Sequence, residues 1–303
     1  MKLHYIVPIL IVFACKIGLA QNANPLETPV YSSMELAMKD AENVYQLSLR
    51  DKHQFYISKD IAKLKKLTFF NAMGNNLEFW TPEIFALKKL EVLNLKLNSL
   101  TYIPKEIAKL NNLLRLNLAN NGITNVPVSI GALDKLRFLH LSINVITEIP
   151  GTIKGCKDLE VLELDNNQLS FLPIEITSLK KLRVLNIGYN QFNELEPEWT
   201  VFKKLEELNA EHNNLRAIPT ELGELSSLKS LLLNNNKLVS LPESLTNLQQ
   251  LELLLVSNNN ISKMPHDLEK LKNLKTLILN GNPISLLEQN RIRKSLPNCK
   301  IYF

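Results

Sequence analysis

One spacing of apolar residues and asparagine repeats every 23 residues along most of this chain, and it constrains the fold more than any other feature. The pattern is Leu-x-x-Leu-x-Leu-x-x-Asn-x-Leu, and ten consecutive copies follow it. A weaker copy precedes them at Val44, with Leu47 and Leu49. A fixed period of this size is typical of a solenoid, in which each structural unit stacks on the next. The ten copies begin at Leu67, Leu90, Leu113, Leu136, Leu159, Leu182, Leu205, Leu228, Leu251 and Leu274.

Each copy contains a short segment in which apolar and other residues alternate. In one copy, Leu93 and Leu95 alternate with Val92, Asn94 and Lys96. A period of two predicts a strand with the two leucines on one face, and stacked copies then form a parallel sheet with strands about 4.8 Å apart. Burying one leucine contributes roughly 1.5–3 kcal/mol, whereas ordering each backbone residue costs about 1–2 kcal/mol. A single copy is therefore unstable until neighbouring copies cover both of its sides.

The asparagines of the repeat form a column at the point where the chain leaves the strand. An inward asparagine offers two amide protons and a carbonyl oxygen to turn backbone in its own and the adjacent copies. We therefore expect a structural ladder rather than a polar recognition surface. Its members are Asn75, Asn98, Asn121, Asn144, Asn167, Asn190, Asn213, Asn236, Asn259 and Asn282.

The second half of most copies reads apolar residue, Pro, two free positions, then Ile-x-x-Leu, as in Ile103-Pro104 followed by Ile107 and Leu110. Proline suits a turn into a short helical or 3-10 segment, and the i, i+3 spacing places both apolar residues on one side. This 23-residue form with its Ile-Pro or Leu-Pro signature resembles the Ras-associated group of intracellular leucine-rich repeat scaffolds and their bacterial relatives. The resemblance covers about residues 44–303. It implies an α/β fold, a right-handed leucine-rich repeat solenoid or horseshoe, with a concave parallel sheet and short helical or 3-10 segments on the convex side.

The unbroken period predicts one elongated domain with distinct ends. We expect a signal peptide over 1–20, a leader over 21–32, an N-terminal cap helix over 33–43, about 11 repeats over 44–284, and a C-terminal cap helix with a final strand over 285–303. In the last segment, Leu286, Leu287, Ile292 and Leu296 are available for burial. The expected final strand reads Leu296-x-x-Cys299-x-Ile301.

The start of the chain resembles an export signal. Lys2 precedes an apolar run, and Gly18-Leu19-Ala20 offers small residues before Gln21, so we expect cleavage after Ala20. Two alternatives are an uncleaved anchor and lipidation at Cys15, which would tether the protein to a membrane. The cysteine-rich caps typical of exported animal and plant members are absent from the sequence. The expected location is therefore outside a bacterial cytoplasm: periplasmic, cell-surface or secreted.

The charge balance argues against a nucleic-acid partner. Removing residues 1–20 deletes Lys2 and Lys16 from 35 basic residues and no acidic residue, which leaves 33 basic against 30 acidic. Cys156 and Cys299 both fall at core-like positions about six copies apart, beyond the reach of a disulfide.

Both tryptophans fall at positions that other copies give to core isoleucines. Trp199 matches Ile107, and Trp80 matches Ile103. In these two copies the proline comes one residue later, as Pro82 and Pro197, so we expect a local bulge in each turn.

The outward strand positions are free of core duty, and we expect a protein partner to bind there. They follow the first leucine of each copy by two, four, six and seven residues, and they mix aromatic, aliphatic and amide groups, which protein interfaces use for anchoring. The chain is expected to act as a monomeric, rigid scaffold. The candidate partner-binding residues are Phe138, His140, Ile143, Tyr189, His212, Leu232, Leu255 and Ile278.

A chemical site is less well supported by the sequence. His140, Glu163 and Asp165 come from adjacent strands, and three such groups can hold a metal or form an acid–base pair. A solvated ion pair is the favoured interpretation, because a single histidine is present and no nucleophile is near. No Gly-rich phosphate loop, Cys-x-x-Cys or His-Glu-x-x-His occurs. We therefore expect no enzymatic activity, cofactor or metal.

Two other functions stay open. One is a surface-anchored structural or adhesive protein that recognises glycans or envelope components. The other is a Ras-like signalling scaffold, which returns if the export signal is misread. Fold alone does not decide between them.

Overall fold

The structure is a computed structural model that describes residues 27–303. The expected signal peptide, its cleavage after Ala20, the alternative lipidation at Cys15 and the first six residues of the leader lie outside the described residues.

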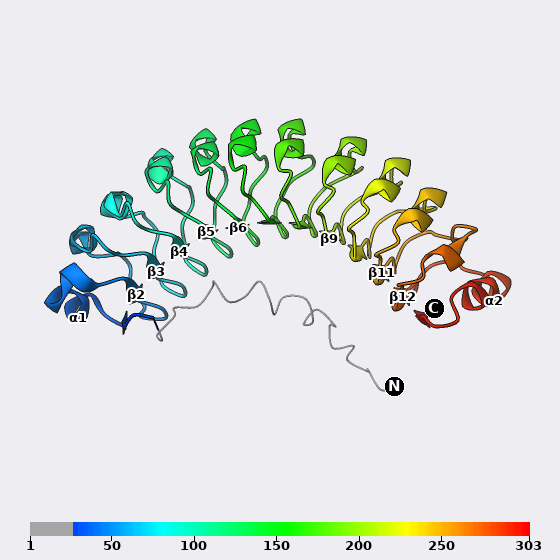
Figure 1. Cartoon of the computed structure of the whole chain (residues 1–303), viewed down its shortest axis with the longest axis horizontal. Coiled ribbons are helices and arrows are strands. Elements are labelled where there is room, and N and C mark those ends of the chain that lie inside the picture. The colour runs from blue at the N-terminus through cyan, green and yellow to red at the C-terminus, as the bar shows by residue number, and fades with distance from the viewer. Residues whose placement is uncertain (1–26) are drawn as a thin grey trace.

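The described chain forms one parallel sheet of thirteen strands in strict sequence order, β1 to β13. Figure 1 shows an arch, with the sheet along its inner side and short helical segments along its outer side. This is the horseshoe expected from the sequence. The strands are β1 (Val30–Tyr31), β2 (Gln46–Ser48), β3 (Phe69–Asn71), β4 (Val92–Asn94), β5 (Arg115–Asn117), β6 (Phe138–His140), β7 (Val161–Glu163), β8 (Val184–Asn186), β9 (Glu207–Asn209), β10 (Ser230–Leu232), β11 (Leu253–Leu255), β12 (Thr276–Ile278) and β13 (Lys300–Tyr302).

From β2 to β12, residues that pair between neighbouring strands lie 23 residues apart in the sequence, which is the repeat period. Leu93 pairs with Leu116, Leu116 with Leu139 and Leu139 with Leu162, each 23 residues further along. All four leucines are fully buried. The period therefore places equivalent side chains in continuous apolar rows, and each copy covers the core of the one before it.

The inward asparagine ladder is confirmed. Asn167 donates from Nδ2 to the carbonyl oxygens of Leu141 in the preceding copy (3.0 Å) and Leu164 in its own (2.9 Å). Its Oδ1 accepts from the backbone N–H of Ile146 (3.0 Å). The same arrangement recurs at Asn190, so one side chain ties each turn to the preceding copy.

The convex segments are 3-10 helices, as the proline pattern predicts. In η6, Pro104 is the N-cap and Ile107 points into the core. The segments are short, three to five residues each, because the hydrogen-bond geometry of a 3-10 helix rarely supports long runs. The segments are η3 (Ala41–Asn43), η4 (Lys59–Lys63), η5 (Pro82–Ala86), η6 (Lys105–Lys109), η7 (Val128–Ala132), η8 (Gly151–Gly155), η9 (Ile174–Ser178), η10 (Pro197–Val201), η11 (Thr220–Glu224), η12 (Glu243–Asn247) and η13 (Leu268–Lys270).

The expected bulges at the two displaced prolines were wrong. η5 and η10 begin at the same repeat position as η6, and Pro82 and Pro197 occupy their first helical turns. Proline is tolerated there because its missing N–H would have no partner in the helix anyway. Trp80 and Trp199 are buried, as expected.

Each end of the arch carries one α-helix. α1 (Met34–Lys39) is capped by Ser33, whose hydroxyl accepts from the N–H of Leu36 (3.2 Å), and it buries Ala37. α2 (Leu286–Ser295) is capped in the same way by Ser285 and buries Ile292.

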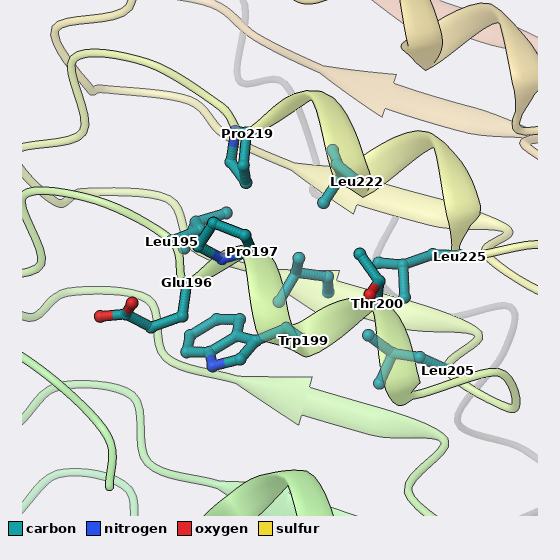
Figure 2. Close-up of a pocket in the computed structure, with 10 residues that line it drawn as sticks. Leu195, Glu196, Pro197, Trp199, Thr200, Leu205, Pro219, Leu222 and Leu225 are labelled. Carbon is teal, nitrogen blue, oxygen red and sulfur yellow. The ribbon is translucent and has the colours of Figure 1, made fainter. Parts of the chain in front are cut away.

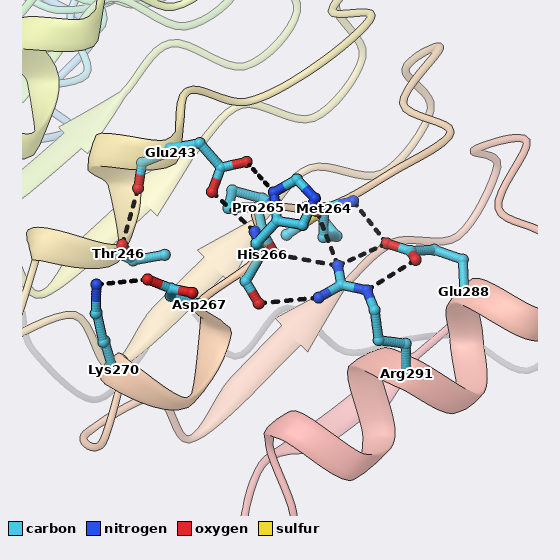
Figure 3. Close-up of polar contacts among 9 residues, drawn as sticks. All are labelled: Glu243, Thr246, Met264, Pro265, His266, Asp267, Lys270, Glu288 and Arg291. Atoms are coloured by element: carbon cyan, nitrogen blue, oxygen red, sulfur yellow. Dashed lines mark hydrogen bonds and ion pairs between the residues drawn. The ribbon is translucent and has the colours of Figure 1, made fainter.

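Polar contacts fasten α2 to the preceding copy, which begins at Leu251, as Figure 3 shows. The Arg291 guanidinium pairs with Glu288 (2.8 Å) and donates to the carbonyl oxygens of Met264 (2.8 Å) and His266 (3.0 Å). Glu288 in turn accepts from the N–H of Met264 (2.8 Å). These bonds satisfy backbone groups that a following repeat would otherwise cover.

Two details of the C-terminal segment differ from the expectation. Leu286 and Leu287 are exposed, because α2 turns Ile292 rather than its first residues toward the core. The last strand is also shifted by two residues: Ile301, not Cys299, pairs with Leu277. The ten-residue α2 replaces a five-residue 3-10 helix, so the chain reaches the sheet later.

The cysteines differ in burial. Cys156 is fully buried, with Sγ 3.3 Å from the Ile130 carbonyl oxygen, whereas Cys299 is partly buried. Burial raises the pKa of the Cys156 thiol to about 12 and that of Cys299 to about 11.

Candidate functional site on the concave face

Burial divides the candidate residues of the concave face into two groups. Phe138, His140 and Leu232 are buried, although the sequence places them on the outward side of their strands. Cross-strand neighbours cover them, since strands in a parallel sheet lie only about 4.8 Å apart. Five candidates keep accessible surface: Ile143 and Tyr189 are exposed, and His212, Leu255 and Ile278 are half-buried.

Arg115, which is not among the residues expected at the site, explains the burial of Phe138. Its guanidinium carbon lies 3.8 Å from the centre of the Phe138 ring, and Arg115 is only 1 % exposed. Arg137 approaches the same ring at 5.3 Å. Burial lowers the pKa of Arg115 to about 10, and its Nε and Nη2 have no hydrogen-bond partner. The signal available in the sequence was a lone arginine among apolar residues two positions after a repeat's first leucine.

The expectation that His140 and Glu163 form a solvated ion pair was wrong in one respect: the two side chains pair, but His140 is buried. His140 Nδ1 lies 2.6 Å from Glu163 Oε2, but the His140 side chain is only 4 % exposed. His140 Nε2 lies 2.9 Å from Arg115 Nη1. Arginine has only donors, so Nε2 accepts and Nδ1–H donates to Glu163. Partial burial raises the pKa of Glu163, but the hydrogen bond from His140 and the charge of Arg115 outweigh it and lower that pKa overall.

Asp165 belongs to a separate set of contacts. It accepts from the Ser142 hydroxyl (2.5 Å) and from Asn186 Nδ2 (2.9 Å). Across residues 27–303, no group of three or more His, Cys, Asp or Glu side chains is placed to hold a metal ion. His140, Glu163 and Asp165 therefore lie on the concave surface in two separate sets of contacts.

In eleven copies the turn after the strand holds a residue in left-handed backbone conformation at the same repeat position, with φ between 51° and 74°, and the first of these turns holds a second one, His53. Asparagine, aspartate and glycine tolerate this region, whereas β-branched and bulky residues are strained in it. Leu97, Ile143 and Tyr189 depart from that preference. The residues at this position are Asp51, Gly74, Leu97, Asn120, Ile143, Asn166, Tyr189, His212, Asn235, Asn258 and Gly281.

These strained side chains line the inner wall without being buried by it. Ile143 is 48 % exposed and Tyr189 is 44 % exposed. The Tyr189 and His212 rings stack at 4.0 Å between centroids, with 14° between their planes. Burial, together with the carboxylates of Glu211 and Asp165, raises the pKa of Tyr189.

A small cavity lies away from this face, between η10 and η11 (Figure 2). Its volume is about 10 Å³, and Trp199, Leu205, Leu222 and Leu225 are among the residues that line it. A space of that size holds one water at most and needs polar partners to do so. It is a packing gap beside a tryptophan rather than a ligand site.

The fold and the inner wall together define a repeat solenoid of the binding-scaffold class. Sequence-family models agree: a "Leucine-rich repeat region" matches residues 83–216 and a "Leucine rich repeat" matches residues 226–284. The chain belongs to the leucine-rich repeat family. Proteins of this family are generally non-catalytic binding scaffolds.

Solved structures show the same architecture. The plant peptide hormone receptor RGFR1 in complex with RGF2 is 29 % identical, with a TM-score of 0.72 over 81 % of this chain and 41 % of the receptor chain. A TDR receptor is 32 % identical, with a TM-score of 0.76 over 84 % of this chain and 46 % of the other. The chain thus spans less than half the length of either receptor structure.

An internalin, InlF, from Listeria monocytogenes is similar in extent as well as in fold. It is 21 % identical, with a TM-score of 0.72, and the match covers 94 % of this chain and 92 % of the internalin. No curated protein sequence gives a significant match. Within residues 27–303, none of the helices has the length and apolar character needed to cross a bilayer.

Proposed function

We propose that this protein is a non-catalytic scaffold that binds a protein partner on its concave face. The observation that carries the proposal is the set of exposed apolar side chains at strained backbone positions. A non-glycine residue in left-handed conformation costs roughly 1–2 kcal/mol. Ile143 and Tyr189 gain little burial in return. Exposed apolar side chains that are retained despite backbone strain are well suited to anchoring a partner.

The spacing of these side chains suits an extended contact. Leu97, Ile143 and Tyr189 lie in every second copy, so successive members are about 10 Å apart at strand spacing. Asparagines occupy the copies between them. We infer that Ile143, Tyr189, His212, Leu255 and Ile278 touch the partner, and that Phe138, His140 and Leu232 hold the wall in place. A rigid wall loses little conformational entropy on binding.

The comparisons support a protein partner. One similar structure is a peptide hormone receptor in complex with its ligand, and its repeats match 81 % of this chain. The proposed scaffold acts as a monomer, has no nucleic-acid partner and needs no cofactor.

The test is capture of the partner by proximity crosslinking in the native cell, followed by its identification and a binding titration. Tyr189→Glu and Leu255→Glu should each abolish capture, because both place a charge in the interface. Ile174→Glu is the matched control, since Ile174 is exposed on the convex segment η9. Undiminished capture by both concave variants would refute the concave-face proposal.

We further propose that the protein is exported from a bacterial cell after cleavage behind Ala20. Mass spectrometry of the mature N-terminus distinguishes the possibilities: a chain starting at Gln21 supports cleavage, and a lipidated Cys15 supports a tethered surface protein. A chain that keeps Met1 in the cytosol would restore the Ras-like signalling scaffold as the better hypothesis.

A further inference from the structure

Four exposed aromatic side chains gather on the loops of the first three repeats, outside the concave face. Phe55, Tyr56 and Phe79 are 65–76 % exposed, and Tyr102 is 44 % exposed. Tyr56, Phe79 and Tyr102 follow the starts of three consecutive copies by the same twelve residues. We call these four residues the aromatic row. Large aromatic side chains left bare in neighbouring copies form a contiguous patch of the kind that marks a binding surface.

Backbone hydrogen bonds hold the loops of the aromatic row in register. The N–H of Asn76 donates to the Gln54 carbonyl oxygen (2.8 Å), and the N–H of Ser99 donates to that of Leu77 (2.9 Å). These bonds lie a few residues before each ring and repeat from copy to copy. Tyr56, Phe79 and Tyr102 therefore recur once per copy, at the same place on each loop.

Hydrogen bonds from buried side chains also hold these loops in place. Trp80 Nε1–H donates to the carbonyl oxygen of Tyr102 (2.8 Å), and the Trp80 ring stacks on Phe85. The Thr81 hydroxyl donates to the carbonyl oxygen of Ile57 (3.0 Å), which is the residue after Tyr56. The aromatic row thus sits on backbone that is tied between copies and needs no ordering on binding.

The position before two of the rings carries a group that bonds to hydroxyls. Glu78 precedes Phe79 and Thr101 precedes Tyr102, Thr124 occupies the same position in the next copy, and all three are exposed. Carboxylate and hydroxyl oxygens accept hydrogen bonds, and threonine also donates. Lys59 and Asp60 follow close behind, so the surface has no dominant charge that would select a nucleic acid or an anionic lipid.

We propose that the aromatic row binds a neutral, β-linked polysaccharide, with its sugar rings stacked on the aromatic rings. An extended β-1,4-linked glycan is a straight chain, suited to a row of side chains in consecutive copies, and each sugar presents an apolar ring face with hydroxyls along its edge. The rings meet the faces, and Glu78, Thr101 and Thr124 meet the hydroxyls. A lipid bilayer is disfavoured as the binding partner, because insertion of Phe79 would desolvate the neighbouring Glu78 carboxylate.

The experiment is calorimetric titration of the full chain with cellohexaose and with chitohexaose, with α-linked maltohexaose as the comparison ligand. Binding of at least one β-linked hexamer, and weaker or no binding of maltohexaose, is expected. Phe79→Ala should weaken binding by about tenfold or more, because the central ring is removed. Its thermal unfolding should match the parent chain, since the Phe79 side chain is 70 % exposed.

Phe171→Ala is the matched control. Phe171 is half-exposed and occupies the same repeat position, but its neighbours at that position are Glu148 and Glu194. It should leave the titration unchanged, as should Tyr189→Glu on the concave face.

Three outcomes would overturn the proposal. They are no heat with either β-linked hexamer at millimolar concentration, equal loss in the Phe79 and Phe171 variants, and Phe79-dependent sedimentation with phosphatidylglycerol vesicles in place of glycan binding.

Discussion

Replacing one asparagine of the ladder measures how strongly adjacent repeats are joined. Asn167→Ala removes three well-formed hydrogen bonds, of 2.9–3.0 Å. It leaves the N–H of Ile146 without its acceptor, whereas the carbonyl oxygens of Leu141 and Leu164 keep their bonds from Asn144 and Asn190. Each bond contributes about 0.5–1.5 kcal/mol net. Water cannot easily replace the lost amide, because Asn167 is buried between copies. We expect the free energy of unfolding to fall by about 1–3 kcal/mol.

The assay is urea unfolding followed by circular dichroism, with the midpoint and the slope both fitted. Gln168→Ala is the matched control: it removes an exposed amide from the next residue and should change the stability by less than about 0.5 kcal/mol. If the two variants unfold at the same urea concentration, the asparagine ladder does not hold the repeats together and the reasoning is refuted.

Three further outcomes are expected. Gly155→Ala should lower the melting temperature, because its new methyl group would overlap a backbone carbonyl oxygen of the preceding turn, whereas Gly122→Ala has its nearest neighbour at 3.7 Å and should be tolerated. Glu206 is partly buried, which raises its pKa, but hydrogen bonds from its two basic neighbours outweigh this and lower it. Its stabilising contribution is therefore fully present above its ordinary pKa of 4.5 and is lost as the pH falls through the lower pKa of the folded state. Glu206→Gln should thus be less stable than the parent chain at pH 7, and the difference should shrink as the pH is lowered below 4.5. Native protein at pH 8 should label with iodoacetamide slowly at Cys299 and not measurably at Cys156, since a thiol with a pKa of about 12 supplies almost no thiolate.

The fold could be predicted because it depends on what each copy shares. Strand register, the leucine rows and the asparagine ladder all follow from a 23-residue period, as Leu116 and Asn167 illustrate. The end of the array was less predictable. Leu286 and Leu287 have the composition of a buried helix face, but the orientation of α2 depends on the Arg291 and Glu288 contacts with the last turn.

The candidate site could be predicted only in outline, because its details depend on what differs between copies. Outward strand positions were identified correctly as a class. The burial of Phe138 depends on the residue at the paired position of the neighbouring strand. That residue is Arg115, and its planar guanidinium covers the Phe138 ring. The aromatic row was missed because Phe79 and Tyr102 lie outside the strand segment. Aligning the copies beyond the asparagine would have revealed it.

A photocrosslinking amino acid tests the central claim about the concave face most directly. Benzoylphenylalanine would replace Tyr189 on the inner wall in one protein and Ile174 on the convex side in another, and both would be irradiated in the native cell. We predict a single major adduct from position 189 and none from position 174. An adduct that forms only from position 174 would show that the partner lies on the outer side of the arch.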